Sequence, residues 1–182
     1  MQEQKKIERI GFADVWNIFG WYWRLSGQSR RWFVASLGFY AVGEIMVNVV
    51  AVVLFKRLID AVTSVPVSPI EDIWFLVGYL SIAFVIQYIF FQLGHSSMAR
   101  YQADSIESIA RYCMEGLNKH SYTFFSNRFA GALIAQTRRF VDGFYVITET
   151  LTYTFWTGGI SLIGIFSVVF YYSWQIGLLL LV

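Results

Sequence analysis

Two polar side chains lie four residues apart inside the first long apolar stretch of the chain. Glu44 and Asn48 stand near the middle of the run from Trp32 to Phe55, and a helix places residues four apart on one face. An acid at the bilayer centre costs about 2.5–3.5 kcal/mol on insertion scales, so acids there mark proton sites or substrate pathways. Two interpretations are open: a polar patch along a substrate pathway, or a hydrogen bond between helices.

Other residues that could do chemistry form no recognisable site. His95 and His120 lie far apart without nearby ligands, and the single cysteine, Cys113, can form neither an internal disulfide nor a cysteine-based metal site. The sequence contains no Gly-x-x-x-x-Gly-Lys-Ser/Thr phosphate loop. We therefore expect no catalytic residue, no cofactor site and no metal site in this chain.

The composition identifies the elements that must position these side chains. The 182 residues are 57% hydrophobic and only 14% charged, whereas a soluble domain is about 25% charged. Apolar runs at 32–55, 73–93 and 144–170 are long enough to cross a bilayer as helices. A fourth run starts at 176 and is unfinished at the last residue, which predicts the N-terminal portion of a longer protein. The fold class is all-α, a polytopic membrane helical bundle.

The positions of the basic residues predict the orientation of the spans. Twelve of the 14 Lys and Arg residues lie in 1–31 and 94–143, and the net charge of +2 is too mild for nucleic-acid binding. Positive residues favour the cytoplasmic side, so we expect a multi-pass plasma-membrane protein with a cytoplasmic N-terminus. The aromatic-rich stretch 12–23 predicts an interfacial helix on the inner leaflet.

The segment 94–143 between the second and third spans is predicted to be a cytoplasmic helical hairpin. Apolar residues recur at helical spacing from Met98 to Leu117 and again from Leu133 to Val141. Between them, the stretch 121–131 combines aromatic and polar residues with a glycine, as expected at a reversal. An apolar tip in water requires a covering surface, which predicts a cytoplasmic partner domain.

The hairpin resembles the first intracellular loop of exporter-fold (type I) ABC transporters. The residues that carry the resemblance are His120, Phe124, Phe125, Gly131, Leu133 and Asp142, with Leu58-Ile59-Asp60 after the first span, Ser173-Trp174-Gln175 before the fourth, and 12–23 as the elbow helix. The resemblance implies the ABC exporter type 1 transmembrane fold, incomplete in this chain. Residues 1–31 would form the cytoplasmic N-terminus with the elbow, and 32–182 a partial transmembrane domain.

The same resemblance implies a coupling helix at the tip of the hairpin. It would dock into a nucleotide-binding domain through Phe124, Phe125, Ser126, Asn127, Arg128, Phe129 and Gly131. ATP and Mg²⁺ would bind in that domain, fused or separate, and not in this chain. The family as a whole hydrolyses ATP to drive export. The further partners implied are the lipid bilayer and a second transporter half, in a homodimer or heterodimer.

The residues also allow readings outside this family. One alternative is a non-ABC membrane scaffold or channel-like subunit of three spans, in which Glu44 and Asn48 line an oligomeric pore. An intramembrane enzyme using Glu44 and Glu149 would need a second acid or a metal ligand at a matching depth, and the sequence offers no such constellation.

Overall fold

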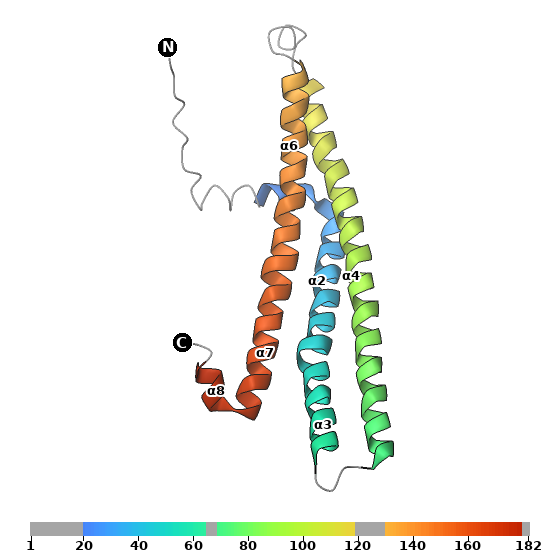
Figure 1. Ribbon diagram of the computed structural model, residues 1–182. Coiled ribbons are helices and arrows are strands. Elements are labelled where there is room, and N and C mark those ends of the chain that lie inside the picture. Colours follow the sequence, from blue (N-terminus) through green and yellow to red (C-terminus); the bar gives the residue numbers. More distant parts are fainter. Residues whose placement is uncertain (1–19, 65–68, 119–129, 180–182) are drawn as a thin grey trace. The chain divides into compact units, whose positions relative to one another are not determined.

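The computed structural model describes residues 20–64, 69–118 and 130–179, and every element in these ranges is helical (Figure 1). Three helices are long and apolar enough to cross a membrane: Arg30–Thr63, Ile70–Gly116 and Ala135–Tyr172. The predictions of an all-helical fold and of three helices able to span a bilayer are confirmed at this level.

The first of these helices consists of three consecutive pieces. α2 (Arg30–Ile45) leads into a π-helical turn, η2 (Met46–Ala51), and then into α3 (Val52–Thr63). The helix is longer at both ends than the predicted run of 32–55. At its far end the Lys56–Asp60 ion pair lies on one face, four residues apart, where such pairs support a helix. The helix stops at Ser64, whose backbone is extended.

The second helix, α4 (Ile70–Asn118), is a single helix of 49 residues. Glu71 and Asp72 lie in its first turn, where acidic side chains favour the helix dipole. It contains no proline. The sequence predicted that the second span continues as a helix beyond residue 93, and α4 does so without a break.

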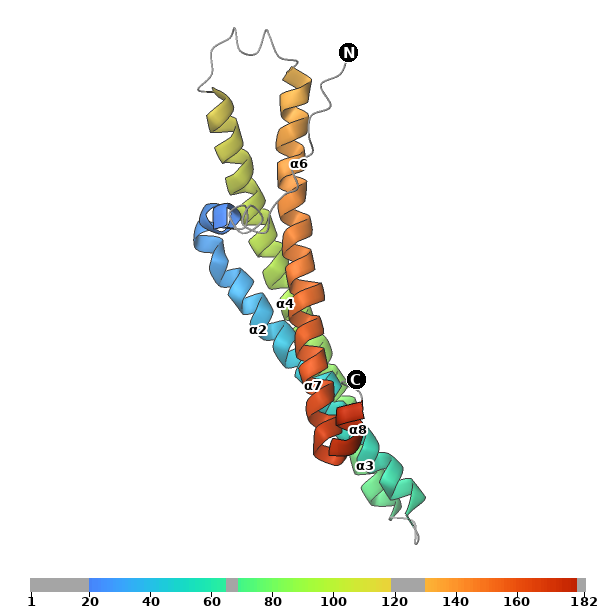
Figure 2. The same ribbon diagram turned by 90° about the vertical axis from the view of Figure 1, so that its left-hand side faces the viewer.

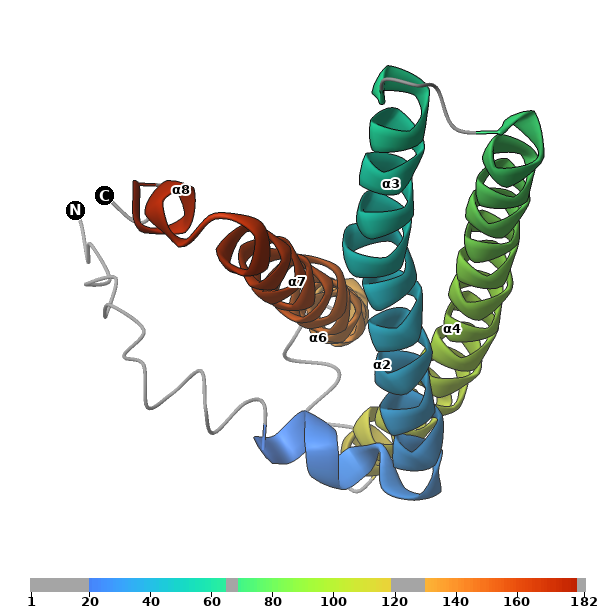
Figure 3. The ribbon, with the colours of Figure 1, turned by 90° about the horizontal axis from the view of Figure 1, so that it is seen from below.

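The third helix also contains a π-helical segment. α6 (Ala130–Glu149) is followed by η3 (Thr150–Thr157) and α7 (Gly158–Tyr172). Extended backbone at Ser173 then separates α7 from the short α8 (Trp174–Leu179). α8 folds back beside the end of α7 (Figure 2 and Figure 3).

The apolar surface of the three helices is largely exposed. In the most apolar window of each, only 17%, 6% and 11% of the residues are buried. A soluble protein rarely exposes apolar surface on this scale. These faces are therefore suited to contact with lipid chains, as expected for a membrane protein.

The chain divides into two compact units, each considered by itself. One contains Met1–Arg30 and Tyr101–Phe144, and the other contains Arg31–Arg100 and Tyr145–Val182. In the second unit glycines allow α2 and α4 to approach closely. A Cβ at Gly94 would lie 2.9 Å from the Tyr40 ring, and one at Gly43 would lie 2.4 Å from the Phe91 ring.

Candidate functional site

The first polar cluster within the spans, the Glu44 cluster, consists of Glu44, Asn48 and Ser161. Glu44 Oε2 accepts a hydrogen bond from Asn48 Nδ2 at 2.7 Å and another from Ser161 Oγ at 2.6 Å. Asn48 Nδ2 also lies 3.1 Å from Ser161 Oγ. The four-residue spacing correctly predicted that Glu44 and Asn48 share a face. The third member comes from α7 and could not be predicted from that spacing.

A small residue on α7 allows this contact. A Cβ at Gly164 would lie 3.3 Å from Val49 Cγ2 and 3.4 Å from Asn48 Cβ, so α7 and η2 pack at close range, as small residues permit in membrane bundles. The hydrogen bond between helices, one of the two interpretations of Glu44, is therefore present. The three polar residues are all half-buried, and a role in a substrate pathway stays a prediction.

We predict that Ser161→Ala lowers the free energy of unfolding by about 0.5–2 kcal/mol, the range measured for hydrogen bonds between membrane helices. The substitution leaves the Glu44 carboxylate with one fewer donor. Glu44→Gln keeps an oxygen acceptor for both donors, so it should lower the free energy of unfolding by less than Ser161→Ala does. The measurement is SDS titration of the full chain in mixed micelles.

Ser167→Ala is the matched control for this prediction. Ser167 lies on the same helix and is exposed, and within the described residues its hydroxyl bonds only to the Ile163 carbonyl of its own helix. An equal loss of stability in both alanine variants would contradict a stabilising role for the Glu44 cluster.

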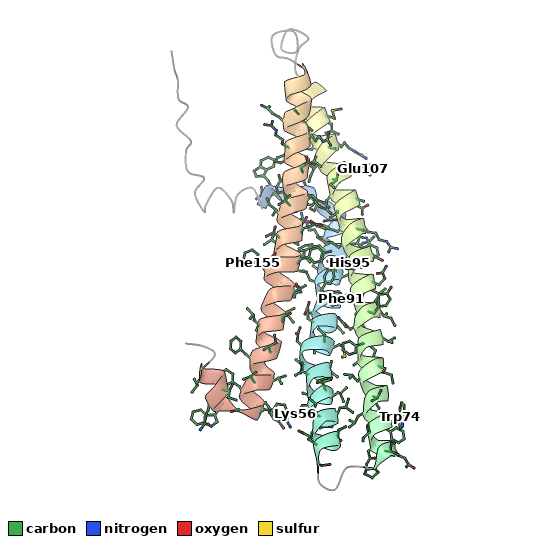
Figure 4. All side chains as sticks on the ribbon, viewed as in Figure 1. Lys56, Trp74, Phe91, His95, Glu107 and Phe155 are labelled. Atoms are coloured by element: carbon green, nitrogen blue, oxygen red, sulfur yellow. The ribbon has the colours of Figure 1, made fainter. Side chains whose placement is uncertain are left out.

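The second polar cluster, the Tyr40 cluster, joins α2, α4 and η3. The Tyr40 hydroxyl lies 3.1 Å from His95 Nδ1 and 3.0 Å from the Tyr153 hydroxyl, and the last two atoms lie 3.1 Å apart. Tyr40 has no exposed surface. Its ring also packs edge-on against Phe91, with the ring centroids 5.6 Å apart, and Figure 4 labels Phe91 and His95 along α4.

The buried Tyr40 hydroxyl has two partners that can accept its proton. It can donate to His95 Nδ1 when that nitrogen carries no proton, and to the Tyr153 hydroxyl otherwise. Because His95 and Tyr153 are both exposed, either can direct a remaining donor away from the cluster. The cluster therefore satisfies the buried Tyr40 hydroxyl with either tautomer of His95.

The Tyr40 cluster was not predicted from the sequence, in which His95 has no nearby partners. Its members are separated by 55 to 113 residues and come from three helices, so no local spacing could reveal them. One available signal was the tyrosine content of otherwise apolar spans, because a buried Tyr hydroxyl needs a partner. Close by, Trp156 Nε1 donates to the Leu37 carbonyl at 2.9 Å.

Each cluster has one member in a π-helical segment. η2 contains Asn48, and η3 contains Tyr153 and Trp156. A π turn accommodates one extra residue, re-aims the side chains within it, and is frequent at functional sites. The two π-helical segments thus each contribute a polar side chain to one of the clusters.

In the other unit, the N-terminal segment packs onto α4 and α6. Residues 20–25 are helical. The Tyr22 hydroxyl donates to the Phe140 carbonyl at 2.9 Å, and the Ser26 and Ser29 hydroxyls pair with those of Tyr101 and Ser105 at 3.1 and 3.0 Å. Burial, with a smaller contribution from Cys113, raises the pKa of Tyr22, so this hydroxyl remains a donor at neutral pH. Only residues 20–23 of the predicted elbow helix lie in the described part.

The predicted coupling residues lie mostly outside the described residues. Those outside are Phe124, Phe125, Ser126, Asn127, Arg128 and Phe129, whereas Gly131 lies in the first turn of α6. Among the described residues, no group of three or more His, Cys, Asp or Glu side chains could hold a metal ion. The polar clusters thus offer hydrogen bonding within the spans.

Comparison of the chain with family models, with curated proteins and with solved structures gave no match in any of the three.

Proposed function

We propose that this chain forms the membrane-spanning part of an ATP-driven ABC exporter and couples the substrate pathway to a nucleotide-binding domain carried elsewhere. The observation that best supports the proposal is the length of the helices before and after residues 119–129. A bilayer needs about 20 helical residues, whereas α4 alone has 49. α6, η3 and α7 together also exceed one crossing.

Such helices suit the mechanism of an ATP-driven exporter. ATP and Mg²⁺ bind in the separate or fused nucleotide-binding domain, and closure of two such domains displaces the hairpin tip. A continuous helix transmits a displacement that an irregular loop would absorb, since helices move as packed rigid elements. The chain itself contributes the spans, the pathway residues and the docking tip, and a second half completes the transporter.

Glu44 and Asn48 are the proposed polar residues of the pathway. They are only half-buried, so part of their surface is available to a second half or to a substrate. Polar groups at mid-membrane commonly line such paths. In the alternative, a three-span scaffold or channel-like subunit, the same pair would line an oligomeric pore with no ATPase involved.

An analysis of the native gene product tests the proposal. Intact-mass measurement with a peptide map across Val182 should reveal a phosphate-loop peptide, either in the same polypeptide or in a subunit that co-purifies with it. A native complex without any such peptide would overturn the exporter and favour the scaffold or channel-like subunit.

A further inference from the structure

Two arginines lie over one tryptophan at one end of the first two spans. The guanidinium carbon of Arg100, on α4, is 4.8 Å from the centre of the Trp32 ring, and that of Arg31 is 5.6 Å from it. We call these three residues the Arg–Trp–Arg cluster. The two guanidinium carbons therefore lie no further apart than the sum of these two distances, which is close to the screening length of about 10 Å in 0.1 M salt.

The chain does not neutralise these two charges within its described part. Neither Arg31 nor Arg100 takes part there in an ion pair or a side-chain hydrogen bond, and both side chains are exposed. Asp104 stands one helical turn beyond Arg100 and forms no ion pair with it in the described residues. The neighbouring Arg30 differs, because it donates to the carbonyls of Trp23 and Arg24 at 2.8 and 3.2 Å.

The Arg–Trp–Arg cluster lies where the apolar runs end. Arg31 is the last charged residue before Glu44, and Arg100 is the first after Asp72. Tryptophan and arginine at such positions lie at headgroup depth. Nearby packing holds α2 and α4 together: Ser36 and Met98 are both buried, with Ser36 Oγ 3.9 Å from Met98 Sδ.

We propose that the Arg–Trp–Arg cluster binds the phosphate group of an anionic phospholipid. A guanidinium carries five donors in a planar fork that matches a phosphate, and an arginine stacked on an aromatic ring keeps its N–H edges free for a ligand. The sequence predicts that this end of the spans is cytoplasmic, and the cytoplasmic leaflet holds the anionic lipids. The inference does not depend on the chain being an exporter.

Titration of the detergent-solubilised full chain with short-chain phosphatidylglycerol, followed by native mass spectrometry, tests this site. Removal of one basic residue near an anionic membrane surface corresponds to roughly fivefold weaker binding. Arg31→Gln and Arg100→Gln should each show about this loss, and the double variant at least the product. The double variant Arg31→Lys/Arg100→Lys keeps both positive charges but lacks the planar guanidinium groups. It should therefore bind the lipid more tightly than the double glutamine variant and more weakly than the unmodified chain.

Two comparisons make the result specific to this site and to a lipid. Arg57→Gln removes the same charge from the other end of the first span and should bind phosphatidylglycerol as the unmodified chain does. Phosphatidylcholine of the same chain length should bind more weakly, and inorganic phosphate should not displace the lipid. Unchanged binding by the double variant, an equal loss in Arg57→Gln, or displacement by inorganic phosphate would each overturn the proposal.

Discussion

Phe125→Asp should abolish the ATP-driven change of conformation while leaving ATP hydrolysis within about twofold of normal. In the proposed exporter, Phe125 is an apolar contact of the hairpin tip with the nucleotide-binding domain. Burying a phenylalanine side chain contributes about 1.5–3 kcal/mol, and an aspartate in the same contact would add the penalty of a desolvated charge. The contact between the hairpin tip and the nucleotide-binding domain should therefore be lost. Closure of the nucleotide-binding domains would then no longer move the spans.

Distances between spin labels on the two halves of the proposed transporter measure this effect. A cysteine at Val62, which is exposed near the end of α3, carries the label in a Cys113→Ser background. ATP should shift the distance distribution in the unmodified protein and in Phe125→Leu, which keeps an apolar side chain. A normal ATP-dependent shift in Phe125→Asp would refute the docking role of this residue.

Tyr40→Ala is expected to cause the largest loss of stability among single substitutions in the spans, about 3 kcal/mol. Tyr40 is fully buried, and its hydroxyl joins two other helices. Large-to-small core substitutions of aromatic residues cost about 3–5 kcal/mol in soluble proteins. We expect a loss at the lower end of this range for Tyr40→Ala. Lipid solvates apolar surface, so the substitution removes only packing contacts and hydrogen bonds.

Two comparisons separate the ring of Tyr40 from its hydroxyl. Tyr40→Phe removes the hydroxyl alone and should cost about 1 kcal/mol. Tyr88→Ala removes a tyrosine that is 70% exposed on α4 and should change the free energy of unfolding by less than about 0.5 kcal/mol. The measurement is SDS-induced unfolding in mixed micelles followed by circular dichroism. If Tyr40→Ala and Tyr88→Ala unfold at the same SDS fraction, the Tyr40 cluster does not stabilise the bundle.

The helices that can span a membrane were predictable because hydropathy acts locally. A run such as 73–93 must be helical in lipid whatever its neighbours are, since its backbone groups have no other hydrogen-bond partners there. The contact between Glu44 and Asn48 was predictable for a similar reason, because both residues lie on one helix four positions apart.

The partners across helices were not predictable in this way. Ser161 meets Glu44 across 117 residues, and the Tyr40 cluster combines three helices, so both depend on how the helices pack. The π-helical segments also escape a hydropathy analysis, since one extra residue in a turn leaves the composition of a run unchanged. The family resemblance rests mainly on residues 120–131, most of which lie outside the described residues.

The two π turns give the spans a particular tolerance to changes in length. A single-residue deletion within Met46–Ala51 would turn the wide turn into an ordinary one and leave the helical register on either side intact. The same deletion in Ile70–Asn118, which is an unbroken α-helix, would rotate every later side chain by about 100° around the axis. The first and third spans should therefore tolerate the loss of one residue at these turns, whereas the second span should not.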